Sequence, residues 1–136
     1  MSSTNYTNTF IAVAEDCPAT TGEIPKVTAK GPTIASLQYQ LLADHPYELT
    51  SDDLLFAVHT RRQAIPQEQW AQARKDFFAK AQACLRSSPL GKRYGWGLHH
   101  DAEGRVALVA VGSARYEELV ADAHLTQTRA MRSRRA

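Results

Sequence analysis

The stretch Lys92–Val111, KRYGWGLHHDAEGRVALVAV, holds the residue types that are best suited to bind a small ligand. Alternation predicts a strand on which Gly95 and Gly97 leave two bare backbone positions between Arg93 and His99. A planar or anionic molecule could lie against that backbone, and the guanidinium of Arg93 could pair with its charge because it donates two bonds to a carboxylate or phosphate. Close packing of a neighbouring element would explain the same glycines, so both interpretations stay open.

Three residues are candidates for catalysis. His99 could carry a proton, because an imidazole in an ordinary environment titrates close to neutral pH. Cys17, in the segment EDCP, could act as a nucleophile, although the neighbouring carboxylates disfavour the reactive thiolate; Asp16 beside it is the third candidate. Cys84 falls on the apolar stripe of a predicted helix and is expected in the core. The sequence leaves open whether the protein is an enzyme.

A metal or cofactor site is not indicated. His99 and His100 lie on opposite faces of the predicted strand and cannot bind one metal ion together. The chain holds none of the spacings HxH, HExxH and CxxC that are typical of metal sites, and no GxSxG, P-loop or GxGxxG motif. We therefore expect no metal and no cofactor.

Charge is distributed unevenly along the chain. The net charge is only +2, but the residues from Leu85 onward carry nine Lys and Arg against five Asp and Glu. The ending RAMRSRRA carries four of these cations, which could bind nucleic acid or an acidic protein partner. A frayed, solvated terminus would explain the same ending. A nucleic-acid- or protein-binding module that uses the basic C-terminal half is therefore the alternative function.

No feature of the sequence indicates a membrane partner or export. The longest uncharged apolar run, near Val106 to Gly112, is far shorter than the roughly 20 residues of a membrane helix. The first residues, MSSTNYTNTF, show no basic leader followed by an apolar core. We therefore expect the protein in the cytoplasm, where the two cysteines would be free thiols.

The N-terminal part predicts a strand, an irregular connection and a helix. The run TFIAVA is β-rich and ends at EDCP, because Pro18 cannot continue the ladder of a central strand. Residues 20–32 hold several Gly, Pro and Thr residues and predict an irregular connection over the surface. Thr33 then caps a helix that ends before Pro46.

Two further helices are predicted in the middle of the chain. Thr50 or Ser51 caps the first of them, and Asp52 and Asp53 occupy its first turn, where the helix dipole favours negative charge. Pro66 opens the next helix. This helix is expected to continue to Leu85 and to bury one stripe, formed by Trp70, Ala73, Phe77, Ala81 and Cys84.

The C-terminal part predicts a hairpin, a helix and a closing strand. Tyr94, Trp96 and Leu98 form the core face of the first hairpin strand. The loop HDAEG follows, with Gly104 supplying a positive φ, and VALVAV is apolar on both faces, as in a central strand. Ser113 starts the helix, and LTQTRAM returns as the closing strand.

These elements predict an α+β domain. We expect a small antiparallel sheet of about four strands covered by helices, in the order β-α-α-α-β-β-α-β. The chain is expected to form a single domain over residues 1–136, with flexible ends at about 1–7 and 133–136. An exposed sheet edge at the first or last strand could support a homodimer.

Four blocks, NTFIAVAEDCP, TSDDLLF, SPLGKRYGWG and AMRSRR, resemble an uncharacterised family of small single-domain proteins, a domain of unknown function. The resemblance spans nearly the whole chain and implies no activity. It gives weight to the blocks around EDCP, GWG and the basic ending. We therefore expect the first strand, the GWG strand and the closing segment to lie near one another around one concavity.

The leading prediction is that the protein binds a small anionic molecule at a cleft near the GWG strand. The ligand-binding residues predicted there are Lys92, Arg93, Gly95, Gly97 and Arg132. The three cations would contact the anion, and the two glycines would let it approach the backbone.

Overall fold

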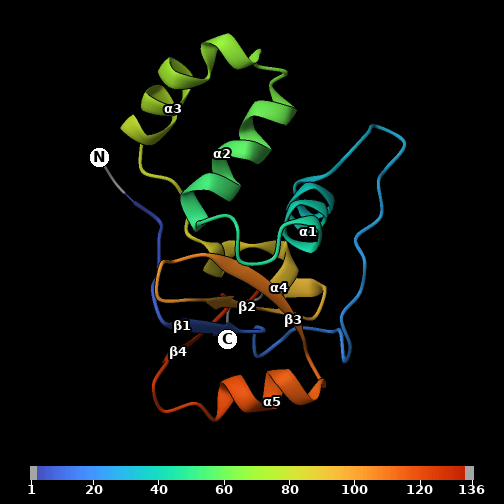
Figure 1. Ribbon diagram of the computed structural model, residues 1–136. Helices are drawn as coiled ribbons and strands as arrows, with labels where there is room; N and C mark the ends of the chain where they lie inside the picture. Colours follow the sequence, from blue (N-terminus) through green and yellow to red (C-terminus); the bar gives the residue numbers. More distant parts are fainter. Residues whose placement is uncertain (1–2, 134–136) are drawn as a thin grey trace.

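The computed structural model describes residues 3–133, in which a four-stranded sheet lies between two layers of helices (Figure 1). The predicted α+β class and the order of the main elements are confirmed. The sheet order is β3-β2-β1-β4, with strands β1 (Thr9–Ala12), β2 (Trp96–His100), β3 (Val106–Ala110) and β4 (Thr126–Arg129). The helices are α1 (Ile34–Asp44), α2 (Ser51–Arg62), α3 (Trp70–Ala79), α4 (Pro89–Arg93) and α5 (Ala114–Val120), with 3₁₀ turns η1 (Gln67–Gln69) and η2 (Leu85–Ser87).

The sheet is mixed, and the prediction that it is antiparallel was wrong. β1 pairs antiparallel with β2 but parallel with β4, while β2 and β3 are antiparallel. β4 runs parallel to β1 because the chain leaves β3, crosses one face of the sheet as α5 and returns beside β1. β1 is therefore an interior strand, and of the two strands expected at an edge only β4 lies there.

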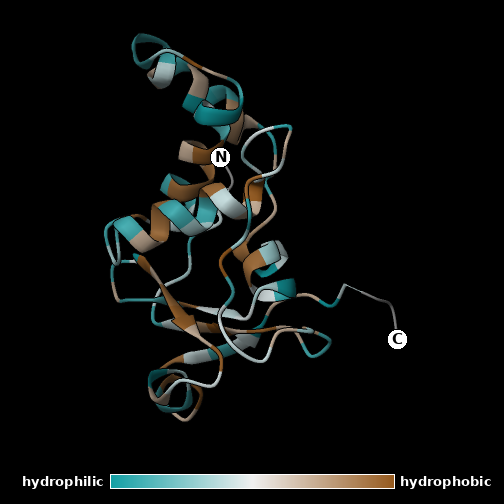
Figure 2. Cartoon of the chain, turned by 90° about the vertical axis from the view of Figure 1, so that its right-hand side faces the viewer, coloured by the Kyte–Doolittle hydropathy of each residue, from teal (hydrophilic) through white to brown (hydrophobic). Residues whose placement is uncertain are grey.

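Alternation along the strands builds one apolar cluster on each face of the sheet. In β1, Ile11 belongs to the cluster that includes residues of α1 and α2, whereas Phe10 and Ala12 belong to the cluster under α5. Helices thus cover both faces (Figure 1), and in Figure 2 hydrophobic residues lie along the central strands. Tyr116 of α5 meets Phe10 edge to face, with ring centroids 5.1 Å apart.

Two of the predicted helix starts are confirmed by their caps. The Thr33 side chain accepts from the backbone N–H of Ser36 at the start of α1, and the Thr50 side chain accepts from that of Asp53 at the start of α2. Each N3 side chain bonds back to the cap backbone, which completes a capping box. Both predictions succeeded because a cap depends only on residues three positions apart.

The predicted helix over 66–85 is shorter in the structure. α3 ends at Ala79, Lys80 is extended, and within α3 only Phe78 is buried. The predicted stripe is not a core face, because α3 rises away from the sheet beside α2 (Figure 1). Ser88 then caps α4 with Pro89 at its first position, so Arg93 ends a helix where a strand was predicted.

Candidate functional site

A pocket of about 320 Å³ opens between α1, α2 and the segment that links α3 to α4. The segment can line this pocket because α3 stops at Ala79 and leaves the next residues non-helical. The lining residues are Ile34, Gln38, Leu55, Val58, His59, Arg62, Gln63, Phe77, Gln82, Ala83, Cys84, Leu85, Ser87, Ser88 and Pro89.

One part of the pocket lining is apolar and aromatic. Leu55 and Val58 come from α2, and Phe77 comes from α3. The imidazole of His59 stacks on the Phe77 ring, with centroids 4.5 Å apart and planes inclined by 29°. Such a surface suits the apolar or planar part of a small ligand.

Gln38 places an unused donor in the same pocket. Its side chain is 3% exposed, and its Oε1 accepts from the Ser88 hydroxyl at 2.6 Å. The Ser88 Oγ also accepts from the backbone N–H of Leu90 at 3.2 Å. Within residues 3–133 the Gln38 Nε2 has no hydrogen-bond partner, which leaves its two hydrogens for a ligand.

Arg62 supplies the charge of the pocket. No Asp or Glu lines it, and Arg62 is the lining residue that carries a full positive charge at neutral pH. The residue lies in the last turn of α2 and is exposed, so its guanidinium can reach a ligand without a desolvation penalty. Arg61 precedes it, is also exposed and does not line the pocket.

Cys84 lines the pocket and is half-buried, although the sequence predicted it in the core. Cys84 lies outside the core because α3 ends at Ala79, before the chain reaches this residue. The Tyr6 hydroxyl donates to the Cys84 Sγ at 3.2 Å. Burial, followed by this hydrogen bond, raises the pKa of Tyr6 to about 12, so the hydroxyl keeps its proton at physiological pH.

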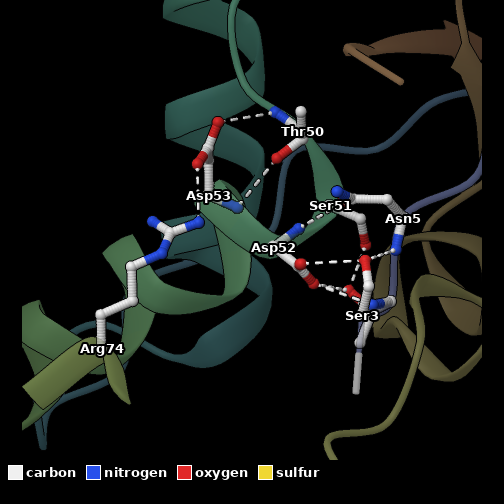
Figure 3. A network of polar contacts seen from close by, with 8 residues as sticks. Ser3, Asn5, Thr50, Ser51, Asp52, Asp53 and Arg74 are labelled. Carbon is white, nitrogen blue, oxygen red and sulfur yellow. Dashed lines mark hydrogen bonds and ion pairs between the residues drawn. The ribbon is translucent and has the colours of Figure 1, made fainter. Parts of the chain in front are cut away.

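Asp52 fixes the N-terminal segment that carries Tyr6 (Figure 3). Its Oδ1 accepts from the Thr4 backbone N–H at 2.8 Å and from the Thr4 hydroxyl at 2.7 Å, and its Oδ2 accepts from the Ser3 hydroxyl at 3.0 Å. The Asn5 Oδ1 accepts in turn from the Asp52 backbone N–H at 2.9 Å. These contacts connect Ser3, Thr4 and Asn5 to the start of α2, and residues 1–2 lie outside the described residues. The expected flexibility of the ends at about 1–7 and 133–136 stays a prediction.

Behind Tyr6 lies a buried histidine whose environment the sequence did not reveal. His100 is 0% exposed, and its ring meets the Tyr6 ring edge to face at 5.3 Å. Neither of its ring nitrogens has a hydrogen-bond partner in the described part of the chain. Burial lowers the pKa of His100 to about 4, so the imidazole is neutral at physiological pH. Strand alternation predicts that this side chain lies on the core face. Whether its ring nitrogens find hydrogen-bond partners depends on residues far away in the sequence, so no local pattern shows it.

The predicted proximity of the first strand, the GWG strand and the closing segment is confirmed. β1 lies between β2 and β4. Beyond β1, the Glu15 carboxylate lies 3.7 Å from the Arg132 guanidinium, and Asp16 accepts from the Ser133 backbone N–H at 3.0 Å. Arg132 thus already has a carboxylate beside it. The cations at 134 and 135 lie outside the described residues.

Three other predicted site residues, Cys17, Lys92 and Arg93, lie outside the pocket lining. The Cys17 thiol faces the Ala19 carbonyl oxygen at 3.9 Å. Lys92 and Arg93 lie in the last turn of α4, where Lys92 is half-buried and Arg93 is exposed. None of these three residues lines the pocket, and their ligand-binding or catalytic roles stay predictions.

Close packing by itself requires glycine at the two GWG positions. A Cβ on Gly97 would lie 2.5 Å from the Phe10 ring and 2.9 Å from the Tyr116 ring. A Cβ on Gly95, whose φ is +79°, would lie 2.2 Å from the Thr21 carbonyl oxygen. The ligand-binding role predicted for these glycines stays a prediction.

His99 lies on the α5 face of the sheet, away from the pocket lining. Its Nδ1 is 2.7 Å from the Tyr47 hydroxyl. Burial, helped by the charge of Arg115, lowers the pKa of His99, so the neutral imidazole is favoured at neutral pH. A neutral imidazole can accept a proton, but no pocket described here brings a substrate to it.

A second hollow of about 470 Å³ lies over α5 and β4 and is lined by Tyr116, Gln127 and Arg129, among others. Two of its polar side chains already have partners, and its lining also holds the Glu117 carboxylate, which disfavours an anion. The Tyr116 hydroxyl accepts from the Val13 backbone N–H at 3.0 Å, and the Gln127 amide donates to the Leu119 carbonyl at 2.7 Å. The pocket beside Gln38 is therefore the better candidate for a ligand site.

Comparison with known proteins identified a family but no activity. A family model described as a family of unknown function (DUF6157) matches residues 1–136, which confirms the resemblance seen in the sequence. Searches of curated proteins and of solved structures found no match. Among residues 3–133, no helix is long and apolar enough to span a membrane, and no group of three or more His, Cys, Asp or Glu side chains could hold a metal ion.

Proposed function

The chain belongs to this family of unknown function, DUF6157, and on the geometry of its site we propose that it binds a small anionic molecule in the pocket beside Gln38. The ligand has an apolar or aromatic body and a carboxylate or similar acidic group. This keeps the ligand class predicted from the sequence but places it at the start of the segment SPLGKRYGWG instead of at its glycines.

The observation that carries the proposal is the unused amide of Gln38. Among residues 3–133 the only buried side-chain nitrogens and oxygens without a partner are those of the His100 ring, so the Gln38 Nε2 is open to water in the pocket and a ligand acceptor could replace that water. Phe77 and Leu55 offer the apolar contact, and Arg62 offers the opposite charge for an acidic group. An amide donor, an apolar wall and an exposed cation in one pocket together suit an amphipathic acid.

A matched pair of arginine variants tests this proposal. Sodium naphthoate, an aromatic carboxylate, is titrated into labelled protein and followed by amide chemical shifts, with uncharged naphthamide as the comparison compound. We expect Arg62→Gln to weaken naphthoate binding about threefold, the range of an exposed ion pair, and to leave naphthamide binding unchanged. Arg61→Gln should change neither, whereas Leu55→Trp should fill the pocket and abolish both. Shifts that map outside the pocket, or equal effects of the two arginine variants, would refute the proposal.

The basic C-terminal half gives a second candidate, a nucleic-acid- or protein-binding surface. Gly91 lies so close to Ala130 that an added Cβ would be 2.8 Å from the Ala130 Cβ. This contact sets the helix of Lys92 and Arg93 beside the strand end that leads to Arg132. If this surface binds an oligonucleotide, the affinity should fall steeply with salt in proportion to the phosphates contacted. Binding of naphthoate in the pocket should depend on salt far less.

A further inference from the structure

We propose that Cys84 is a covalent acceptor in this pocket and takes up small carboxylate-bearing thiols as mixed disulfides. The proposal rests on the proposed function, because it uses the same pocket and the same anion contact, Arg62. It adds a reaction and a nucleophile. It also assigns a role to Tyr6, which lies behind the pocket lining.

The first argument is the direction of the hydrogen bonds at the two cysteines. At Cys84 the sulfur accepts from the Tyr6 hydroxyl at 3.2 Å, so a hydrogen-bond donor faces the atom that would attack a disulfide. At Cys17 the arrangement is the reverse, because the sulfur lies 3.9 Å from the Ala19 carbonyl oxygen. A carbonyl oxygen can only accept, so this contact needs the hydrogen of the thiol. Glu15 and Asp16 precede Cys17, whereas no carboxylate lines the pocket of Cys84.

The second argument is that the donor is held in place. The Tyr6 ring rests edge to face on the buried His100, and the preceding residues Ser3 and Thr4 are bound to Asp52 (Figure 3). The hydroxyl therefore points at the sulfur without a large loss of side-chain entropy when the thiolate forms. Because the pKa of Tyr6 lies far above neutrality, this group remains a donor throughout the physiological range.

The third argument is independent of the cysteine and points to a ligand. Gln38 is more than nine-tenths buried and lines the same pocket, and its Nε2 has no partner within residues 3–133. A carboxylate or amide oxygen of a bound thiol compound can accept from this amide, while its acidic group pairs with Arg62. The pocket thus offers both recognition groups and a nucleophile.

The reaction is thiol–disulfide exchange with a small disulfide as co-reactant. The Cys84 thiol loses its proton to water, and the thiolate attacks one sulfur of the small disulfide. The new bond joins Cys84 to that sulfur as the old sulfur–sulfur bond breaks. The second half leaves as a thiolate, which water protonates. Cys84 and the half that it binds become a disulfide, and the departing half is reduced.

Two probe disulfides separate recognition from intrinsic reactivity. Dithiobis(nitrobenzoate) carries a carboxylate on each aromatic ring, whereas dithiodipyridine carries no carboxylate. Each is mixed with Cys17→Ser protein, in which only Cys84 can react, and with Cys84→Ser protein, in which only Cys17 can. The released coloured thiol gives the rate, and intact mass gives the adduct. We expect Cys84 to react with the charged probe at least about tenfold faster than Cys17.

Further variants are made in the Cys17→Ser background. Tyr6→Phe keeps the ring on His100 but removes the donor, and should slow both probes about fivefold, the effect of one hydrogen bond. Arg62→Gln should slow only the charged probe, by about threefold, and Arg61→Gln should slow neither. Thermal unfolding of each variant verifies that it is folded.

The outcomes distinguish this inference from the proposed function. If naphthoate binds the pocket but Cys84 reacts no faster than Cys17, or if Tyr6→Phe leaves the rate unchanged, the covalent role is wrong and the binding proposal stands. If naphthoate also fails to bind and does not protect Cys84, both are wrong. Protection of Cys84 by naphthoate, together with unchanged naphthoate affinity in Cys84→Ser, would support both.

Discussion

The Ser88 hydroxyl donates to the Gln38 Oε1 at 2.6 Å, a bond between two residues that are both buried and lie 50 positions apart in the chain. It ties the middle of α1 to the start of α4 beside the candidate pocket. Ser88 also caps α4 through the Leu90 backbone N–H. One hydroxyl therefore holds a helix start and orients the amide that we assign to the ligand.

Ser88→Ala should destabilise the fold by about 2 kcal/mol. The variant removes a helix cap, worth about 1 kcal/mol, and leaves the buried Gln38 oxygen without its donor. Ser87→Ala is the matched control, because the hydrogen-bond partner of the half-buried Ser87 hydroxyl within residues 3–133 is the Met131 sulfur, at 3.7 Å, and its loss should cost under about 0.5 kcal/mol. Urea unfolding measures both. Equal midpoints for the two variants would contradict the role given to Ser88.

Asp52→Ala should release the N-terminal segment. Asp52 accepts three hydrogen bonds from Ser3 and Thr4, so we expect a loss of about 2 kcal/mol in the free energy of unfolding and faster hydrogen exchange at the Thr4 amide. Arg74→Gln breaks an ion pair with Asp53 of 3.0 Å that is partly exposed, and should cost about 1 kcal/mol or less. If Thr4 exchanges at the wild-type rate in Asp52→Ala, the segment is held by other contacts.

The sequence predicted those features that depend on neighbouring residues. Thr33 predicted one helix start, and Thr50 or Ser51 predicted a second, at which Thr50 is the cap. Alternation around Phe10 and Leu98 predicted strands with defined faces. The sequence-based prediction was wrong at the end of α3, which stops at Ala79. The spacing of Phe77 and Cys84 fits one face of a helix whether or not that face is buried.

The candidate site was hidden from the sequence for a related reason. The Tyr6–Cys84 bond joins residues 78 positions apart, and the Gln38–Ser88 bond joins residues from different helices. No local pattern marks either pair. In the clearest local signal, GWG, Gly97 packs closely against Phe10, and its predicted ligand-binding role stays a prediction. Likewise, the parallel pairing of β4 follows from the path of α5 over the sheet, which strand periodicity does not encode.

Gly97→Ala should destabilise the domain by about 2 kcal/mol, because the new methyl group would overlap the Phe10 and Tyr116 rings. In a double-mutant cycle with Phe10→Leu, we expect part of this loss to be recovered, since the smaller side chain makes room. Gly31→Ala, where a Cβ meets nothing within 4 Å, is the comparison for backbone strain alone. Simple additivity of Gly97→Ala and Phe10→Leu would show that the ring contact does not determine the glycine.

His100 should make the fold sensitive to mild acid. Its pKa is about 4 in the folded protein and about 6.5 when unfolded, so between these values the unfolded chain binds a proton that the folded chain does not. Stability contributed by the neutral imidazole is therefore complete above about pH 6.5 and falls as the pH is lowered toward 4, by about 3 kcal/mol in total. The loss stops below the folded pKa, where both states are protonated.

The difference between wild type and His100→Leu isolates this effect. Leucine fills the buried site and has no group to protonate. The free energy of unfolding of this variant should therefore fall less steeply than that of the wild type between pH 6.5 and 4, while the variant remains folded at neutral pH. His124→Gln, which changes an exposed histidine, should keep the wild-type slope. Urea unfolding at several pH values gives the curves. Parallel curves for wild type and His100→Leu would mean that His100 takes up a proton as easily in the folded protein as in the unfolded chain, and that Tyr6 packs against a more polar site than its contacts indicate.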